Sequence, residues 1–206
     1  MATKPLPTKA DVDLMIDLGV SRVYLSQLLK AAGLNGDWVP VKSGPTTSSP
    51  LSSDERDVLR AGGADLDIRG LNPAVARFRL HELVSESRSL IDEAYDTKAA
   101  SKRLGMSEAA IKREIYCVPP RLHGIQLADN RLVLPSWQFT KSGIVPHLES
   151  LLSFASSMSP LALSRFMLRP HQDLEEEEQR ISPREWLVRG HTPTLVLDLV
   201  NVLMKD

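Results

Sequence analysis

The stretch from Thr97 to Ile115, TKAASKRLGMSEAAIKREI, constrains the fold more than any other part of the chain. Gly105 divides it and is the residue type best suited to the positive φ angle that ends a helix. The pattern predicts one helix over 98–104, capped by Thr97, and a second over 108–115, capped by Ser107. Small or apolar residues fall where the two helices would face each other and a common core: Ala100, Leu104, Met106, Ile111 and Ile115.

Two short helices joined by a glycine-containing turn are typical of the helix-turn-helix, whose second helix lies in the DNA major groove. Small residues at the start of that helix would let its backbone approach a duplex. The residues expected on the DNA-facing side are Ser107, Glu108, Ala109, Lys112 and Arg113. Helical hairpins that bind no DNA share this pattern, so both interpretations stay open at this point.

The distribution of charge favours the DNA-binding interpretation. The net charge is −1, yet residues 97–145 carry +5 while the segments on either side carry −3 each. A local basic patch is what phosphate binding requires. We predict that Lys112 and Arg113 contact DNA, and that Lys102 and Arg103 lie near its backbone. A solvated surface is the alternative explanation.

A β-hairpin is predicted directly after the two helices. Ile125 and Leu127 alternate with polar neighbours, as do Leu132 and Leu134, and Asp129-Asn130 supplies the turn. A hairpin in this position is the order of a winged helix-turn-helix. Arg131, at the hairpin tip, is placed to reach a phosphate. Trp137 and Phe139 are expected to fill the core beneath the hairpin.

Residues 10–34 repeat the pattern of the central stretch. The segment LGVSRVYLSQLL aligns without gaps on LGMSEAAIKREI, which places Gly19 with Gly105 and Ser21 with Ser107. A second helix-turn-helix led by Ser21, Arg22 and Tyr24 is one interpretation. An ordinary helical hairpin is the other, and it is favoured by acidic residues that would repel phosphate: Asp11, Asp13 and Asp17.

The composition along the chain predicts four parts. Residues 1–34 form an N-terminal helical segment, and 35–53, rich in Gly, Pro, Ser and Thr, form a linker. Residues 54–145 form the helix-turn-helix domain with its hairpin, preceded by a short helix over 54–60 and a long amphipathic helix over 74–95. Residues 146–206 form a C-terminal helical domain. The predicted fold class is mainly α.

The C-terminal part contains two further helical patterns, divided near Ser159, and then an acidic run over 175–178 that is expected to be a solvated loop. Two proline-started helices follow, over 183–189 and 193–204, and are predicted to form a hairpin around Gly190. Its apolar side would hold Trp186 and Leu187 with Leu195, Leu199 and Val202. The hairpin either closes the core or presents a partner-binding surface with Arg184, Trp186 and Arg189.

Signals for catalysis or metal binding are absent from the sequence. It has no glycine-rich phosphate loop, HExxH, CxxC or GxSxG motif, and its five histidines show no metal-ligand spacing. We therefore expect no enzyme activity, no cofactor and no metal. A single cysteine, no signal peptide and no apolar run of about 20 residues favour a cytoplasmic protein without a membrane segment.

Several short motifs resemble bacterial antitoxins of the Xre/ParS type, and most closely those of actinobacterial DNA-binding proteins. The resemblance covers roughly residues 90–200, with SPREWL as its most specific segment. The matching motifs are AAxxxLGxS at 99–107, LPxxQF at 134–139, VPxL at 145–148 and SPxxWLxxG at 182–190. The resemblance implies a helical dimer, autoregulatory binding to double-stranded DNA, and a RES-type toxin partner that consumes NAD.

Three functional hypotheses follow. The first is a DNA-binding antitoxin that represses its own operator and neutralises a cognate toxin. The second is a stand-alone transcription regulator without a toxin. The third is a helical protein-interaction module with no role on DNA. We expect a symmetric homodimer under the first two, because two-fold proteins match palindromic half-sites.

Overall fold

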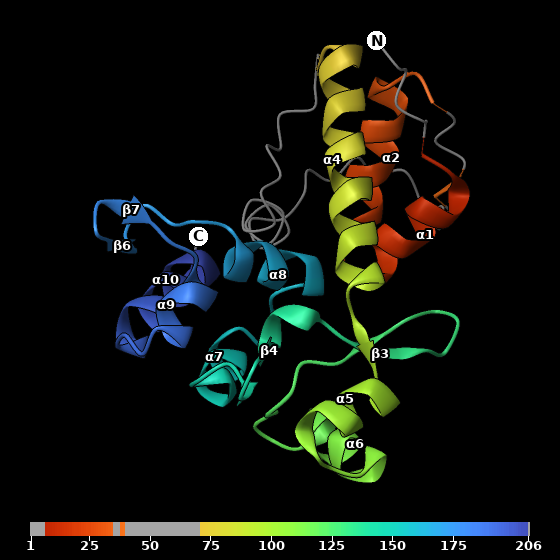
Figure 1. Ribbon diagram of the computed structural model, residues 1–206. Coiled ribbons are helices and arrows are strands. Elements are labelled where there is room, and N and C mark those ends of the chain that lie inside the picture. Colours follow the sequence, from red (N-terminus) through yellow and green to blue (C-terminus); the bar gives the residue numbers. More distant parts are fainter. Residues whose placement is uncertain (1–6, 35–37, 40–70, 206) are drawn as a thin grey trace. The chain divides into compact units, whose positions relative to one another are not determined.

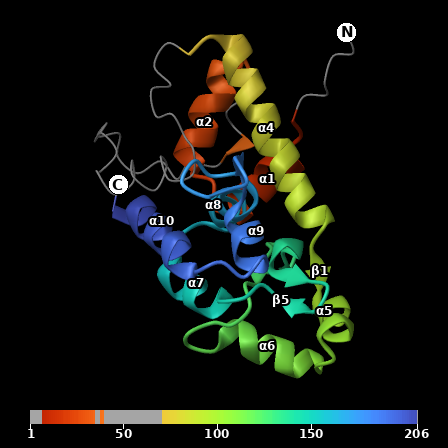
Figure 2. The same cartoon turned by 60° about the vertical axis from the view of Figure 1, so that its left-hand side comes forward.

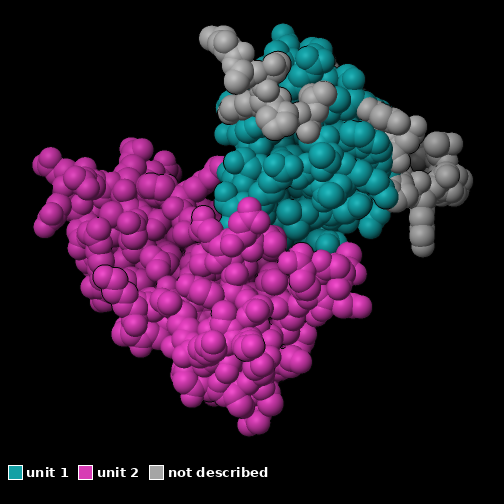
Figure 3. All heavy atoms as spheres, turned by 45° about the vertical axis from the view of Figure 1, so that its right-hand side comes forward, with its two compact units in different colours: residues 1–89 teal, residues 90–206 magenta. Residues whose placement is uncertain are grey.

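The described part of the chain is mainly α-helical with small sheets, as the sequence predicts. The computed structural model describes residues 7–34, 38–39 and 71–205. The predicted helix over 54–60, and the predicted linker apart from Trp38 and Val39, lie outside the described residues. Two compact units divide the chain, residues 1–89 and residues 90–206 (Figure 3). No helix within the described ranges is long and apolar enough to cross a membrane.

The first unit contains α1 (Lys9–Asp17), α2 (Arg22–Ala31) and most of α4 (Pro73–Asp92). The predicted helical pair over 10–34 is confirmed, with Gly19 at φ 85° in the turn and Ser21 capping α2. Helix α2 runs beside α4 in both views (Figures 1 and 2). Tyr24, expected at the start of an outward helix face, is instead buried.

Two arginines of α4 join it to the helical pair. The Arg88 guanidinium binds the Asp11 carboxylate at 2.7 and 2.9 Å, and Arg77 Nε donates to the Ala32 carbonyl at 2.8 Å. Burial raises the pKa of Asp11, but hydrogen bonds from Arg88 and Thr8 outweigh it and hold this pKa below its usual value. Asp11 is therefore a structural anion.

After the last turn of α4, the second unit continues with a strand that the sequence did not predict. The predicted helix over 74–95 ends at Asp92, and Tyr95–Asp96 forms β1. Helices α5 (Thr97–Leu104) and α6 (Glu108–Tyr116) follow, then β2 (Ile125–Gln126) and β3 (Leu132–Leu134). The predicted hairpin is confirmed, and β1 joins it to give an antiparallel sheet in the order β1-β3-β2.

The register of this sheet decides which residues enter the core. Ile125 lies opposite Val133, and Tyr95 lies opposite Leu134. Val133 and Leu134 are buried, whereas Leu132, which was predicted to alternate inward, is only half-buried. After β3 the chain forms a 3-10 turn (Ser136–Gln138), β4 (Phe139–Thr140) and β5 (Gly143–Ile144).

The remaining helices pack in pairs. Helix α7 (Leu148–Phe154) packs with α10 (Pro193–Lys205), and α8 (Pro160–Leu168) packs with α9 (Pro183–Val188). Trp137 and Phe139 fill the core as predicted, and Trp137 Nε1 donates to Ser164 Oγ at 3.0 Å. This bond crosses the boundary that the sequence placed between 145 and 146.

Two C-terminal predictions are wrong. The acidic run is not a loop, because β6 (Glu175–Glu176) and β7 (Gln179–Arg180) form a hairpin whose two-residue turn, Glu177-Glu178, has positive φ at both positions. On α10 the buried residues are Val196 and Val200, while Leu195 and Val202 are 42% and 56% exposed.

Candidate nucleic-acid interface

The pair α5–α6 is set by its caps and its turn. Asp96, rather than the predicted Thr97, caps α5 by accepting from Ala99 N at 2.6 Å. Gly105 takes a φ of 65° and ends α5, as predicted. The Ser101 hydroxyl donates across the turn to the Met106 carbonyl. The positive φ of Gly105 and the hydrogen bond from Ser101 to Met106 therefore hold the turn in one conformation, which fixes where α6 starts.

Helix α6 has one buried face and one exposed face. Ile111 and Ile115 are buried, as predicted, while Leu104 and Met106 are half-buried. Ser107 caps the helix by accepting from Ala110 N at 3.2 Å. The exposed face holds the predicted set, Glu108, Ala109, Lys112 and Arg113, and continues to Tyr116. Gly124 lies against the inner face, because a Cβ there would come within 2.7 Å of Ile115.

The cations around this face differ in their freedom to bind a phosphate. Lys102, Lys112 and Arg113 are exposed and make no ion pair within the described residues. Arg103 is engaged inside the protein. Its Nη2 donates to the Thr140 carbonyl at 2.7 Å, and its guanidinium lies over the ring of Tyr95. The Tyr95 and Phe139 rings form a T-shaped pair. Arg103 thus holds β4 to α5.

The hairpin tip is nearly neutral. Arg131 Nε lies 2.7 Å from Asp129 Oδ2, and the Arg131 backbone N–H donates to the same carboxylate. These hydrogen bonds, the backbone one first, hold the pKa of Asp129 below its usual value. Asn130 takes the positive φ of the turn. Arg131 is exposed as predicted, but its charge is already paired.

Gln138 and His123 form a buried polar pair next to β2. Gln138 is fully buried, and its side-chain amide both accepts from His123 N and donates to His123 O at 2.8 Å. The ring of His123 is buried with Nε2 unpartnered among the described residues. Burial lowers the pKa of His123 to about 4, so the ring stays neutral at pH 7. The glutamine and the histidine are structural.

Arg184, predicted to be exposed for a partner, is turned inward. Its Nε donates to the Trp137 carbonyl at 2.7 Å, and its Nη2 donates to the Phe139 carbonyl at 2.9 Å. These two bonds join the start of α9 to the 3-10 turn and β4. Arg184 is half-buried, and both of these bonds are internal, so it closes the core.

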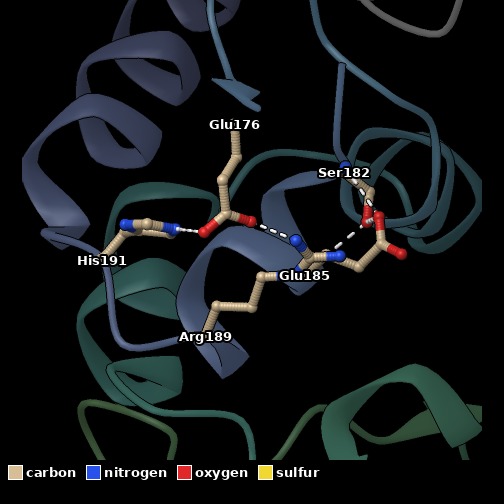
Figure 4. A network of polar contacts seen from close by, with 5 residues as sticks. All are labelled: Glu176, Ser182, Glu185, Arg189 and His191. Carbon is tan, nitrogen blue, oxygen red and sulfur yellow. Dashed lines mark hydrogen bonds and ion pairs between the residues drawn. The ribbon is translucent and has the colours of Figure 1, made fainter. Parts of the chain in front are cut away.

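Arg189 belongs to a polar cluster that links the β6–β7 hairpin to α9 (Figure 4). Glu176 pairs with Arg189 and, at 2.8 Å, with His191 Nε2. The hydrogen bond from Arg189 is the main cause that holds the pKa of Glu176 below its usual value. Trp186 is buried, donates to the Thr192 carbonyl at 2.8 Å and stacks on His191 at 4.2 Å. Ser182 and Glu185 form the capping box of α9.

Sequence reasoning missed two partners that shape these surfaces. Thr97 Oγ1 donates to Glu108 Oε2 at 2.7 Å, which links the first residues of α5 and α6. His191 and Glu176 come together although 15 residues separate them. Neither contact has a spacing signal in the sequence, since each depends on how two elements pack. Among the described residues, no group of His, Cys, Asp or Glu could hold a metal ion.

Comparisons of the chain with models of protein families, with curated proteins and with solved structures found no match.

Proposed function

We propose that this chain binds double-stranded DNA through α6 and acts as a transcription regulator of the antitoxin type. One observation carries the DNA-binding part. Lys112 and Arg113 stand exposed and without an ion pair in the described part of the chain, on a helix whose other face is buried. Cations so placed neutralise phosphates at little cost, because no internal partner must be given up.

The surroundings of α6 fit this role. Ala109 and Ala110 leave its first turn narrow, so that the helix backbone can approach the floor of the major groove. The sheet β1-β3-β2 would lie beside the duplex as a wing. Arg103 and Arg131 contribute less to this interface than the sequence alone suggests, since Thr140 and Asp129 already engage them.

The test is a binding titration with a DNA fragment selected by the full-length protein from a genomic pool. Lys112→Ala combined with Arg113→Ala should weaken binding and lower the magnitude of the salt slope by about one unit per lost phosphate contact. Where one of these side chains contacts a base, its loss should reduce the binding free energy for the preferred sequence by about 1–3 kcal/mol. Fluorescence anisotropy at several salt concentrations measures both effects.

Lys141→Ala combined with Arg180→Ala is the matched control, because it removes the same charge from exposed positions outside α5 and α6. It should leave the slope within about half a unit of wild type. Equal losses in both double variants, or none in either, would show that α6 does not read DNA. A chain that selects no DNA at all would favour the interaction-module hypothesis.

The antitoxin part of the proposal rests on the SPREWL resemblance and on exposed apolar residues of the C-terminal helices. Val188, Leu195 and Val202 are each more than 40% exposed. Apolar side chains left on a surface are typical of protein contacts. We propose that these side chains form a surface that, together with Arg189, binds a RES-type toxin.

Point substitutions test this better than deletion of 183–206, which would also remove the buried Trp186, Leu187 and Val196. Leu195→Ser with Val202→Ser should keep the melting temperature and the DNA affinity. It should weaken neutralisation of a toxin encoded beside this gene by tenfold or more, the cost of losing about 1.4 kcal/mol of contact. Unchanged neutralisation would contradict this surface, and a gene without a toxin neighbour would favour the stand-alone regulator.

A further inference from the structure

Glu108 is an unusual residue for a DNA-facing helix, because its charge opposes phosphate. It is the first residue of α6 and is exposed. Its Oε2 accepts from the Thr97 hydroxyl of α5 at 2.7 Å. The hydrogen bond from Thr97 therefore fixes the orientation of the Glu108 carboxylate. This carboxylate lies at the end of α6 that would enter the major groove first.

Among the other side chains at the start of α6, only the Ser107 hydroxyl can form hydrogen bonds. The Ser107 hydroxyl accepts from Ala110 N as the helix cap. Ala109 and Ala110 carry only methyl groups. Glu108 Oε1, in contrast, has no hydrogen bond to any residue that the structure describes. In this turn, Glu108 Oε1 is therefore the charged acceptor that is available to a base.

The chemistry of a carboxylate restricts which base it can contact. An ionised carboxylate only accepts hydrogen bonds. In the major groove guanine presents two acceptors, thymine an acceptor and a methyl group, and adenine an acceptor beside its amino group. Cytosine alone presents a donor, its 4-amino group, without an adjacent acceptor. A fixed carboxylate here therefore favours cytosine and repels the other bases.

We infer that Glu108, positioned by Thr97, is a specificity-determining residue of the α6 interface that selects a cytosine through its 4-amino group. The inference rests on the proposed DNA binding. Lys112 lies one helical turn further along the same face and supplies the attraction that Glu108 lacks. The negative charge weakens binding to every wrong sequence, which is how a repulsive group creates specificity.

The experiment compares the base preferences of full-length variants by selection from a randomised duplex, followed by anisotropy with single-base changes. Wild type should prefer cytosine at one position by on the order of tenfold. Glu108→Gln should move that preference toward adenine, because a glutamine amide pairs with the N6 and N7 of adenine. Thr97→Val should reduce the discrimination several-fold while the affinity for the best site changes less than twofold.

Glu93→Gln is the matched control, since it makes the same charge change at an exposed position outside α5 and α6 and should leave base preference unaltered. Cytosine preference that persists in Glu108→Gln overturns the inference, and so does an equal gain in affinity for all four bases. In those cases a salt-slope loss in the Lys112 and Arg113 variant still supports DNA binding. A wild type that binds no duplex overturns both proposals.

Discussion

His123, whose ring is buried, contributes to the response of this protein to pH. Its ring lies in the interior without a partner for Nε2 in the described part of the chain, close to Trp137, and its pKa falls to about 4. The unfolded chain binds a proton at this residue near pH 6.5, whereas the folded chain does so only near pH 4. Acid therefore favours the unfolded state through this group.

We predict that the free energy of unfolding falls between about pH 6.5 and pH 4, by up to about 3 kcal/mol from His123. Urea unfolding at pH 7, 5.5 and 4.5 measures the fall. His123→Phe keeps a planar aromatic ring at this position, removes the titrating group and should flatten the profile in this window. A profile that is equally steep with phenylalanine would assign the acid sensitivity to other groups.

Individual arginines were the hardest residues to predict from the sequence. Arg103 and Arg184 both occur in polar, helix-forming contexts that suggested cations free to bind a partner. Each instead donates to backbone carbonyls of residues 137–140, far away in the chain. The direction of a guanidinium depends on which carbonyls a fold leaves unsatisfied, and no local pattern records that.

Elements bounded by strong caps were predicted well. Gly105, Ser107 and the Ser182-Pro183 pair mark helix ends within one or two residues of where α5, α6 and α9 have them. The two-residue strand β1 was not predicted, because it exists only through its pairing with β3. The β6–β7 hairpin was missed since glutamate is a poor residue for positive φ, and its turn uses two of them.

The β6–β7 turn therefore offers a direct stability test. A two-residue hairpin turn with positive φ at both positions favours Asn-Gly, and glutamates there carry a strain of order 1 kcal/mol each. Glu177→Asn with Glu178→Gly should raise the free energy of unfolding by about 1–2 kcal/mol. Thermal melting at fixed pH and salt measures it.

A similar pair of substitutions at an unstrained site gives the control. Glu82→Asn with Ser85→Gly lies inside α4 and should destabilise, because both residues are poorer helix formers. A melting temperature for the hairpin variant that stays at or below wild type would show that the turn is not strained. The positive φ angles of Glu177 and Glu178 would then not lower the free energy of unfolding.

For the whole molecule, one α6 helix contacts one half-site, so regulation from a palindromic operator requires two copies. We predict a symmetric dimer with a mass near twice 22.8 kDa. Light scattering between about 1 and 50 μM, with and without the selected DNA, measures it over the range of micromolar association. A clean monomer under both conditions would contradict the dimer.

The Asp11–Arg88 ion pair joins residues that are 77 positions apart, which ties the first unit to the timing of protein synthesis. A ribosome adding roughly 5–20 residues per second needs roughly 4–15 s to pass from one residue to the other. During that interval α1 and α2 emerge without α4, and the Asp11 carboxylate has no cation. The pace of translation across this region thus determines how long an incomplete helical pair is open to chaperones and proteases.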